Sequence, residues 1–407
     1  MLDNITSELS ELLGDDMIDT LFVGLSKTIE TGDFQYLMSA YIRVLREKGL
    51  NIDRLQIPMN KISGLRHPRY GVILLTYADD ELDTMYIPHE RLQHVQDKGF
   101  DHLRHTPFAP VLERPNTVAQ RSLLVDDVEF DRLRELKAEG YTDYAVVNMV
   151  LPHGPSQLCS VATRDPNGLG ANVESLIEEL LPSFSICLYG AYQSNVATSL
   201  AGTYLGNRTG GNVLSGSMYR GSQDTIDAGI MFCDVRGFTA MSERLGAEGV
   251  VRVMNDVFQI IEDEILPRRG EILKFIGDAL LVVFPRCPEL SDSQIAEFMI
   301  QSAIRSVSKV EEHGRELGLP LSVGFGCHLG RVLYGNIGTS TRLDFTVMGP
   351  AVNLTSRLES MCKSLGAQLT VSKVVAQNYN ADLHSFGVHS VKGVSEPVEI
   401  WGVPVNG

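Results

Sequence analysis

The strongest constraint on the fold of this 407-residue chain is an apolar segment that ends in an acid and leads into a helical pattern. Residues 228–235, AGIMFCDV, are apolar up to Asp234 and predict a buried strand. Residues 241–266 then carry apolar side chains at the spacing of an amphipathic helix. Two apolar runs within 270–284 surround a Gly-Asp pair and predict a hairpin. The chain from residue 226 onward is therefore expected to fold around a sheet.

The same half of the chain continues with alternating elements. A helix is expected over 291–316, a strand over 321–330, and a strand followed by a helix over 343–365. This order predicts an α+β fold with a ferredoxin-like palm, in which an antiparallel sheet carries helices on one face.

The first half is expected to form a separate α+β domain. Helical patterns extend through residue 45, and short strand-like runs follow at 51–59, 70–78, 144–152 and 158–165. A new helical stretch begins near residue 173 and leads into a segment rich in Gly and Ser. We therefore predict an α+β domain over 1–175, a helical linker or transducer over 176–225, and the sheet domain over 226–407.

The charge of the chain limits its partners and its substrate chemistry. The formal net charge is −16 and the pI is about 5.1, which argues against general binding to nucleic acid or to anionic membranes. An anionic substrate would need metal ions or a local cluster of Lys and Arg. The six cysteines lack metal-site spacing. Neither a signal-peptide layout nor a membrane-spanning apolar run is present, so we expect a cytoplasmic protein.

Two acids are the first candidates for chemistry. Asp234 comes at the end of the apolar strand, and Asp278 lies in the turn of the following hairpin. Carboxylates at the same end of neighbouring strands can hold a pair of divalent ions for phosphoryl transfer. A Gly-Asp turn is common, however, and one Asp at a strand end carries little information by itself.

The residues after Asp234 form a second candidate. Arg236, Gly237, Phe238 and Thr239 precede the predicted helix, and a Gly-containing turn at a helix N-terminus suits a phosphate group. The alternative is an ordinary strand-to-helix loop in which Thr239 caps the helix.

Taken together, these motifs resemble a known family. The sequences FCDVRGFTAMSERL, LKFIGDALLVVF, GCHLGRVLYGNIGTSTRLDFTVMGPAVNLTSRLES and VKGVSEPVEIW occur in this order. They are similar to the catalytic domain of class III adenylyl and guanylyl cyclases over about residues 226–403. Four separate motifs at the family's spacing make the resemblance specific.

The resemblance implies a metal site and a transition-state site. Asp234 and Asp278 would bind two divalent ions, Mg²⁺ or Mn²⁺, with help from the carbonyl of Val235. Asn353 and Arg357 match a family pair one helical turn apart, and both would project from one face of a helix. Asn353 would orient the ribose, and Arg357 would stabilise charge on the α-phosphate in the transition state.

The resemblance also assigns substrate-binding residues. Lys274 falls at the base-reading position where adenylyl cyclases of this family have Lys, and an ammonium can donate to adenine N1. Thr346 stands at the second base-reading position in place of the Asp of mammalian adenylyl cyclases. Lys392 matches a phosphate-binding Lys, and Arg342 is a weaker candidate for the same role. Phe238 and Thr239 complete the set of substrate-binding candidates. Without the family context, the three cations read as solvated surface residues.

We therefore expect an adenylyl cyclase that converts ATP to 3′,5′-cyclic AMP as a homodimer. The alternatives are a guanylyl or dual-specificity cyclase and, from a different class, a catalytically inactive dimeric signalling module. A diguanylate cyclase is set aside because the hairpin reads FIGDA and not a Gly-Gly-Asp-Glu-Phe-like sequence. Pro350 departs from the Asp or Asn that relatives often have after the Gly.

The first domain is less legible from its sequence. Its α+β alternation and length resemble a GAF- or PAS-like sensor, which implies a small-molecule or protein regulator without identifying it. His89, His94, His102 and His105 lie close together in the sequence. Their spacing fits no metal template, so ordinary loop and helix histidines are the favoured interpretation.

Overall fold

The computed structural model describes residues 15–59, 72–87, 103–152, 156–216 and 223–404. The chain divides into two compact units, one ending at Thr203 and the other beginning at Tyr204. Among the described helices, none combines the length and apolarity that crossing a bilayer requires. All six cysteines are free thiols and five of them are buried, which is usual for unpaired cysteines.

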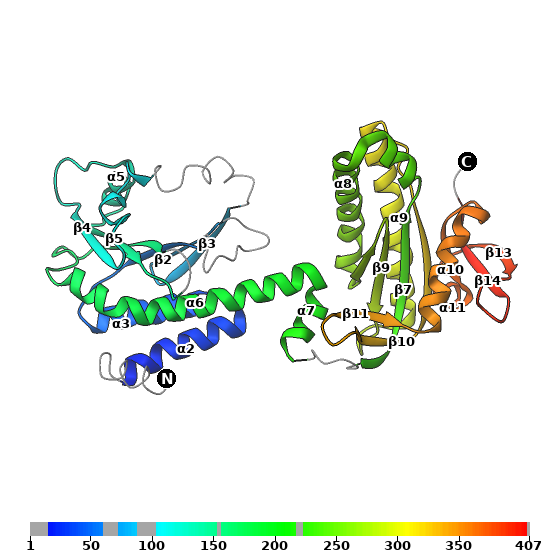
Figure 1. Cartoon of the computed structure of the whole chain (residues 1–407), viewed down its shortest axis with the longest axis horizontal. Coiled ribbons are helices and arrows are strands. Elements are labelled where there is room, and N and C mark those ends of the chain that lie inside the picture. Colours follow the sequence, from blue (N-terminus) through cyan, green and yellow to red (C-terminus); the bar gives the residue numbers. More distant parts are fainter. Residues whose placement is uncertain (1–14, 60–71, 88–102, 153–155, 217–222, 405–407) are drawn as a thin grey trace. The chain divides into compact units, whose positions relative to one another are not determined.

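The N-terminal unit consists of one antiparallel sheet with helices (Figure 1). Its strands pair in the order β3-β2-β1-β6-β5-β4. The strands are β1 (Arg54–Met59), β2 (Val72–Ala78), β3 (Glu81–Ile87), β4 (Thr117–Ser122), β5 (Asp143–Met149) and β6 (Gln157–Thr163). The helices are α2 (Asp15–Thr31), α3 (Gln35–Glu47), η3 (Ala109–Val111), α5 (Asp131–Ala138) and α6 (Val173–Leu205). The predicted α+β alternation is confirmed, although the sequence did not predict β3 or β4.

The two faces of this sheet contact different helices. In β1, Leu55, Ile57 and Met59 alternate with less buried residues and join a core formed with α2, α3 and α6. The opposite face packs on α5 in a smaller core. Side chains of α6 from Val173 to Val196 belong to the first core. That part of the helix is therefore stabilised by the N-terminal unit.

The C-terminal unit contains an eight-stranded sheet and the residues with catalytic motifs. Its strands pair in the order β13-β14-β12-β10-β7-β9-β8, and β11 pairs with β10. The strands are β7 (Gln223–Val235), β8 (Glu271–Ile276), β9 (Ala279–Pro285), β10 (Val323–Gly338), β11 (Leu343–Met348), β12 (Ala367–Ser372), β13 (His384–His389) and β14 (Val398–Pro404). The helices are α7 (Asn207–Leu214), α8 (Phe238–Ile265), η4 (Leu266–Arg268), α9 (Asp292–Leu317), α10 (Pro350–Leu365) and α11 (Lys373–Gln377).

Two details differ from the expected palm. The sheet is not wholly antiparallel, because β10 and β12 run parallel. Helices also cover both faces: α8 and α9 pack on one face, and α10 lies on the other (Figure 1). In β10, Phe325 and Cys327 join the core with α8 and α9, whereas a Cβ on the intervening Gly326 would meet the backbone of Glu359 in α10. Glycine at this position lets α10 approach the strand closely.

Candidate active site

The two metal-binding candidates lie together at one end of the sheet. Asp234 is next to last in β7 and pairs with Ala279 at the start of β9. Asp278 occupies the turn between β8 and β9, where Gly277 has a φ of 65°. The backbone N–H of Val235 donates to the carbonyl oxygen of Asp278 at 3.2 Å. The register of β7 and β9 therefore brings the two acids to the same edge, as the sequence predicted.

The electrostatics of Asp234 reflect this placement. Its pKa is raised above the ordinary value, first by burial and then by the charge of Asp278, while Arg236 acts in the opposite direction. Two carboxylates that repel each other are a ready ligand set for a divalent cation.

A cavity of about 710 Å³ opens at these acids. It is lined by Asp234, Val235, Arg236, Gly237, Phe238, Thr239, Ala240, Asp278, Ser322, Val323, Cys362, Lys363, Gly366, Ala367 and Gln368. The start of α8 therefore faces the same space as the acids. The N-cap residue of α8 is Gly237, in the left-handed conformation with no side-chain cap, so the alternative in which Thr239 caps the helix is wrong. The backbone N–H groups of the first turn suit an anion.

The residues present fit a divalent cation with oxygen ligands. Among the described residues, no group of three or more His, Cys, Asp or Glu side chains gathers around a possible metal position. Magnesium commonly binds through one or two carboxylates and completes its coordination with water and substrate phosphates. Asp234 and Asp278 match that pattern, whereas zinc would need more His or Cys ligands.

The sequence analysis did not assign a role to Arg236, which contacts Asp234, one of the two candidate metal-binding acids. Its Nη1 lies 3.5 Å from Oδ2 of Asp234, and its Nη2 lies 2.9 Å from Oε1 of Glu359 in α10. Burial raises the pKa of Glu359 to about 7, although Arg236 opposes this shift. A sequence signal for the Arg236–Glu359 pair was absent, because the residues lie in separate motifs that only the fold brings together.

The first base-reading candidate also has an acidic neighbour. Lys274 in β8 is half-buried, and its Nζ forms an ion pair with Asp344 in β11. Thr346 lies two residues beyond Asp344 and is buried. The fold therefore brings β8 and β11 together and places Lys274 near the strand that carries Thr346.

The transition-state candidates occupy the exposed side of α10. Asn353 and Arg357 are both exposed, and their four-residue spacing places them on one face of the helix. Gly349 is the N-cap of this helix, and Pro350 takes the first helical position. Proline is tolerated there because the N–H of that position has no partner within the helix. Arg342 lies exposed in the β10–β11 turn, and Lys392 lies exposed between β13 and β14.

One copy of the C-terminal unit does not gather all the candidates in one cavity. The cavity at the acids is lined by Asp234, Val235, Phe238, Thr239 and Asp278 from the predicted set. The remaining predicted residues, Lys274, Thr346, Asn353, Arg357, Arg342 and Lys392, are not among its lining residues. The metal-binding set and the base-reading set therefore occupy different places on the same unit.

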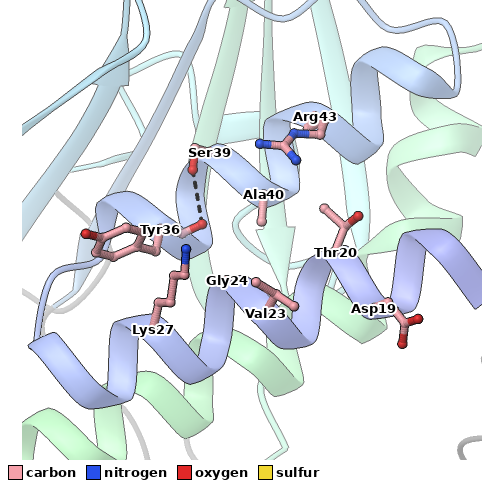
Figure 2. Close-up of a pocket in the computed structure, with 9 residues that line it drawn as sticks. All are labelled: Asp19, Thr20, Val23, Gly24, Lys27, Tyr36, Ser39, Ala40 and Arg43. Atoms are coloured by element: carbon pink, nitrogen blue, oxygen red, sulfur yellow. Dashed lines mark hydrogen bonds between the residues drawn. The ribbon is translucent and has the colours of Figure 1, made fainter.

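The N-terminal unit has a cavity of its own, about 340 Å³ between α2 and α3 (Figure 2). Lys27 lies 5.5 Å from the ring centre of Tyr36. The charged lining residues Asp19, Lys27 and Arg43 are all exposed. His105 is also exposed, and His89, His94 and His102 lie outside the described residues.

Comparison with known proteins places the C-terminal unit in a family. The family model of the adenylate and guanylate cyclase catalytic domain matches residues 221–403. An adenylate cyclase of Anabaena cylindrica is 33% identical over 190 residues, which are 45% of this chain and 38% of that protein. Adenylate cyclase 1 of Rhizobium meliloti is 32% identical over 42% of this chain and 27% of that protein. The chain thus spans less than half the length of these curated relatives.

Solved structures include similar domains. The adenylyl cyclase CyaB from P. aeruginosa is 28% identical, covers 46% of this chain and 97% of its own, and has a TM-score of 0.41. The guanylyl cyclase Cya2 is 33% identical, covers 45% of this chain and 94% of its own, and has a TM-score of 0.39. Since the family model spans helices α8 to α11 and both acids at the cavity, residues 221–403 belong to the adenylate and guanylate cyclase catalytic domain family.

Proposed function

We propose that this chain is an adenylyl cyclase that converts ATP to 3′,5′-cyclic AMP and pyrophosphate. The observation that carries this proposal is the pair Asp234 and Asp278 at one cavity, beside the N-terminus of α8. Two divalent ions, Mg²⁺ or Mn²⁺, would supply activation of the attacking ribose hydroxyl and charge neutralisation of the triphosphate. The relatives named adenylate cyclases support the proposal.

Lys274 supports ATP over GTP. Its ammonium can donate to adenine N1, whereas guanine N1 carries a proton and is better met by a carboxylate. The ion pair with Asp344 restricts where that ammonium points. Thr346 can both donate and accept, so it discriminates less between the bases. A guanylyl or dual-specificity cyclase is the alternative within the family, and Cya2 is a guanylyl cyclase of similar sequence.

The experiment that tests the proposal measures product from ATP and from GTP with Mg²⁺ or Mn²⁺. We expect cyclic AMP to form faster than cyclic GMP with either metal. Equal or faster turnover of GTP would favour the guanylyl or dual-specificity alternative. No product from either nucleotide would favour an inactive signalling module.

Base selection can be changed by substitution. Lys274→Glu with Thr346→Cys should lower ATP turnover by at least about tenfold and raise the relative use of GTP, because the site then accepts from guanine N1. Lys274→Glu would put a carboxylate beside Asp344, so Asp344→Asn is included in the variant. Asp344→Asn alone is the matched control. An unchanged ATP preference in the combined variant would show that the base pocket is elsewhere.

We further propose that the active site is completed by a second copy of the chain. The metal-binding acids and the base-reading residues occupy different places on one catalytic unit. A two-fold dimer would then build two equivalent sites, each with Asp234 and Asp278 from one subunit. Its mate would contribute Lys274, Thr346, Asn353 and Arg357, and the exposure of Asn353 and Arg357 on α10 supports this arrangement.

We propose that the N-terminal unit regulates the rate, and that the segment before β7 transmits the signal. The start of α7 contacts two catalytic strands: the N–H of Thr209 donates to the Glu271 carboxylate of β8 at 3.4 Å, and its hydroxyl lies 3.4 Å from that of Tyr334 in β10. β8 also carries Lys274. A small molecule or a protein would be the regulator, and the cytoplasm remains the proposed location.

Truncation tests this regulatory proposal. A cut at residue 175 would strip the apolar side chains of α6 from their core, so the truncated chain should begin at Tyr204 and keep α7. We expect the basal rate per catalytic unit to change by about fivefold or more, while turnover still requires Asp234. A dimeric truncated protein with an unchanged rate would contradict regulation by the N-terminal unit.

A further inference from the structure

Arg236 lies between two carboxylates, and only one of them is a metal-ligand candidate. Its Nη2 approaches Oε1 of Glu359 at 2.9 Å, and its Nη1 is 3.5 Å from Oδ2 of Asp234. The guanidinium is therefore held more closely by α10 than by the metal site. The Glu359 side chain is only 12% exposed, so this ion pair is shielded from solvent.

Two glycines of β10 leave space beside the guanidinium of Arg236. A Cβ at Gly324 would lie 2.7 Å from Cζ of Arg236, which is closer than real carbon contacts allow. A Cβ at Gly326 would lie 2.7 Å from the Cα of Glu359. These two glycines of β10 make room for the Arg236 side chain and for the segment of α10 that carries Glu359.

The contact between Arg236 and Glu359 is an ion pair without aligned hydrogen-bond geometry. Nη2 of Arg236 and Oε1 of Glu359 are both buried, and neither has a hydrogen-bond partner among the described residues. Within that same part of the chain, the acids paired with the guanidinium are Asp234 and Glu359. If Glu359 lost its charge, Asp234 would be the remaining acid for Arg236.

A guanidinium and a divalent cation compete for the same carboxylate oxygens of Asp234. Arginine forms two parallel hydrogen bonds with a carboxylate, and such a pair would occupy both oxygens. Magnesium and manganese also need carboxylate oxygens at close range. We propose that Glu359 is a positioning residue for the metal site: it holds Arg236 against α10 and so leaves the Asp234 carboxylate to the divalent cation. This inference rests on the proposed function, because it takes Asp234 as a metal ligand.

The test measures binding of Mn²⁺ alone to the full-length chain by electron paramagnetic resonance. The titration is run at about pH 8, above the pKa of about 7 to which burial raises Glu359. Asp234→Ala should abolish one Mn²⁺ site. Glu359→Gln should lower the Mn²⁺ affinity of that same site by about tenfold, which is the size expected when a group that supports a metal ligand is lost. Glu312→Gln, at an exposed position of α9, should leave binding unchanged.

Removal of the competing cation separates this role from a purely structural one. Arg236→Met, and the double variant Arg236→Met with Glu359→Gln, should bind Mn²⁺ at least as tightly as wild type. Mn²⁺ affinity that is unchanged in Glu359→Gln, or weaker in Arg236→Met, would overturn the inference. So would a wild-type chain with no Mn²⁺ site that depends on Asp234. If Glu359→Gln does not fold, the Mn²⁺ affinity of Arg236→Met alone tests the inference.

These outcomes are distinct from those of the proposed function. Mn²⁺ binding that follows the expected order in a chain that forms no cyclic nucleotide would support the role of Glu359 and contradict the adenylyl cyclase proposal. If the wild-type chain is an active adenylyl cyclase and its Glu359→Gln variant binds Mn²⁺ as tightly as wild type, the proposed function is supported and the role of Glu359 is contradicted.

Discussion

Asp234→Ala and Asp278→Ala should each lower cyclic AMP formation by at least about 100-fold, because a catalytic divalent ion contributes several kcal/mol to transition-state stabilisation. Both acids line the same cavity, and Asp278 is one of the causes of the raised pKa of Asp234. Steady-state turnover with Mn²⁺ and with Mg²⁺ measures the loss.

The fold should survive these substitutions. The charge of Asp278 raises the pKa of Asp234, so the ionised pair is repulsive in the absence of metal. Asp278→Ala removes that repulsion, and we expect its metal-free unfolding temperature to equal or exceed that of wild type. Stabilisation by Mn²⁺ should disappear in both variants. Asp382→Ala, at an exposed position before β13, is the matched control.

A variant that retains more than about a tenth of wild-type turnover would show that its residue is not a metal ligand. A tenfold loss corresponds to about 1.4 kcal/mol of transition-state stabilisation, which is too small for a metal ligand. The circular dichroism spectrum of each variant should match that of wild type, and a spectrum that differs would identify a variant that fails to fold.

The local features of the catalytic unit were predictable from sequence. The segment ending in Asp234 is apolar because β7 is buried between two cores, so both its strand character and its end are visible in the residues. Gly277 and Asp278 mark a tight turn, and a hairpin places that turn beside the neighbouring strand. The pairing of β7 with β9, which α8 and β8 separate in the sequence, then brings the two acids to the same end of the sheet.

Contacts between distant segments were not predictable in the same way. The ion pairs of Lys274 with Asp344 and of Arg236 with Glu359 depend on how β11 and α10 pack on the sheet. Gly326 and Gly330 leave room for α10 on one side of β10, and this role is visible only when the neighbouring atoms are placed. The parallel pairing of β10 and β12 likewise depends on the path of the chain through α10.

The N-terminal unit shows the limit of pattern reasoning more strongly. β3 alternates exposed and half-buried residues, so it lacks the apolar run that identified the central strands. The long α6 carries Pro182 within it, which in sequence suggests a break, yet the helix continues to Leu205. Packing of its side chains into the core offsets the lost backbone bond.

The proposed sharing of the active site between two subunits predicts that two inactive variants recover activity together. Asp278→Ala would remove a proposed metal ligand, and Arg357→Ala would remove the proposed transition-state cation, so each variant alone should be nearly inactive in both sites of its dimer. In a mixed dimer, one site would carry both substitutions and the other would carry neither. Random exchange between equal amounts makes half the dimers mixed, each with one intact site, which gives about one quarter of the wild-type rate.

The most direct measurement is therefore the cyclic AMP formed by an equimolar mixture of Asp278→Ala and Arg357→Ala protein after subunit exchange. Differently tagged copies that purify together would demonstrate the exchange, and a mixture of Asp278→Ala with Asp234→Ala is the control, because both substitutions fall in the same half-site. We expect recovery toward about one quarter of the wild-type rate in the first mixture and none in the control. No recovery in the first mixture despite demonstrated exchange would contradict a site built from two subunits.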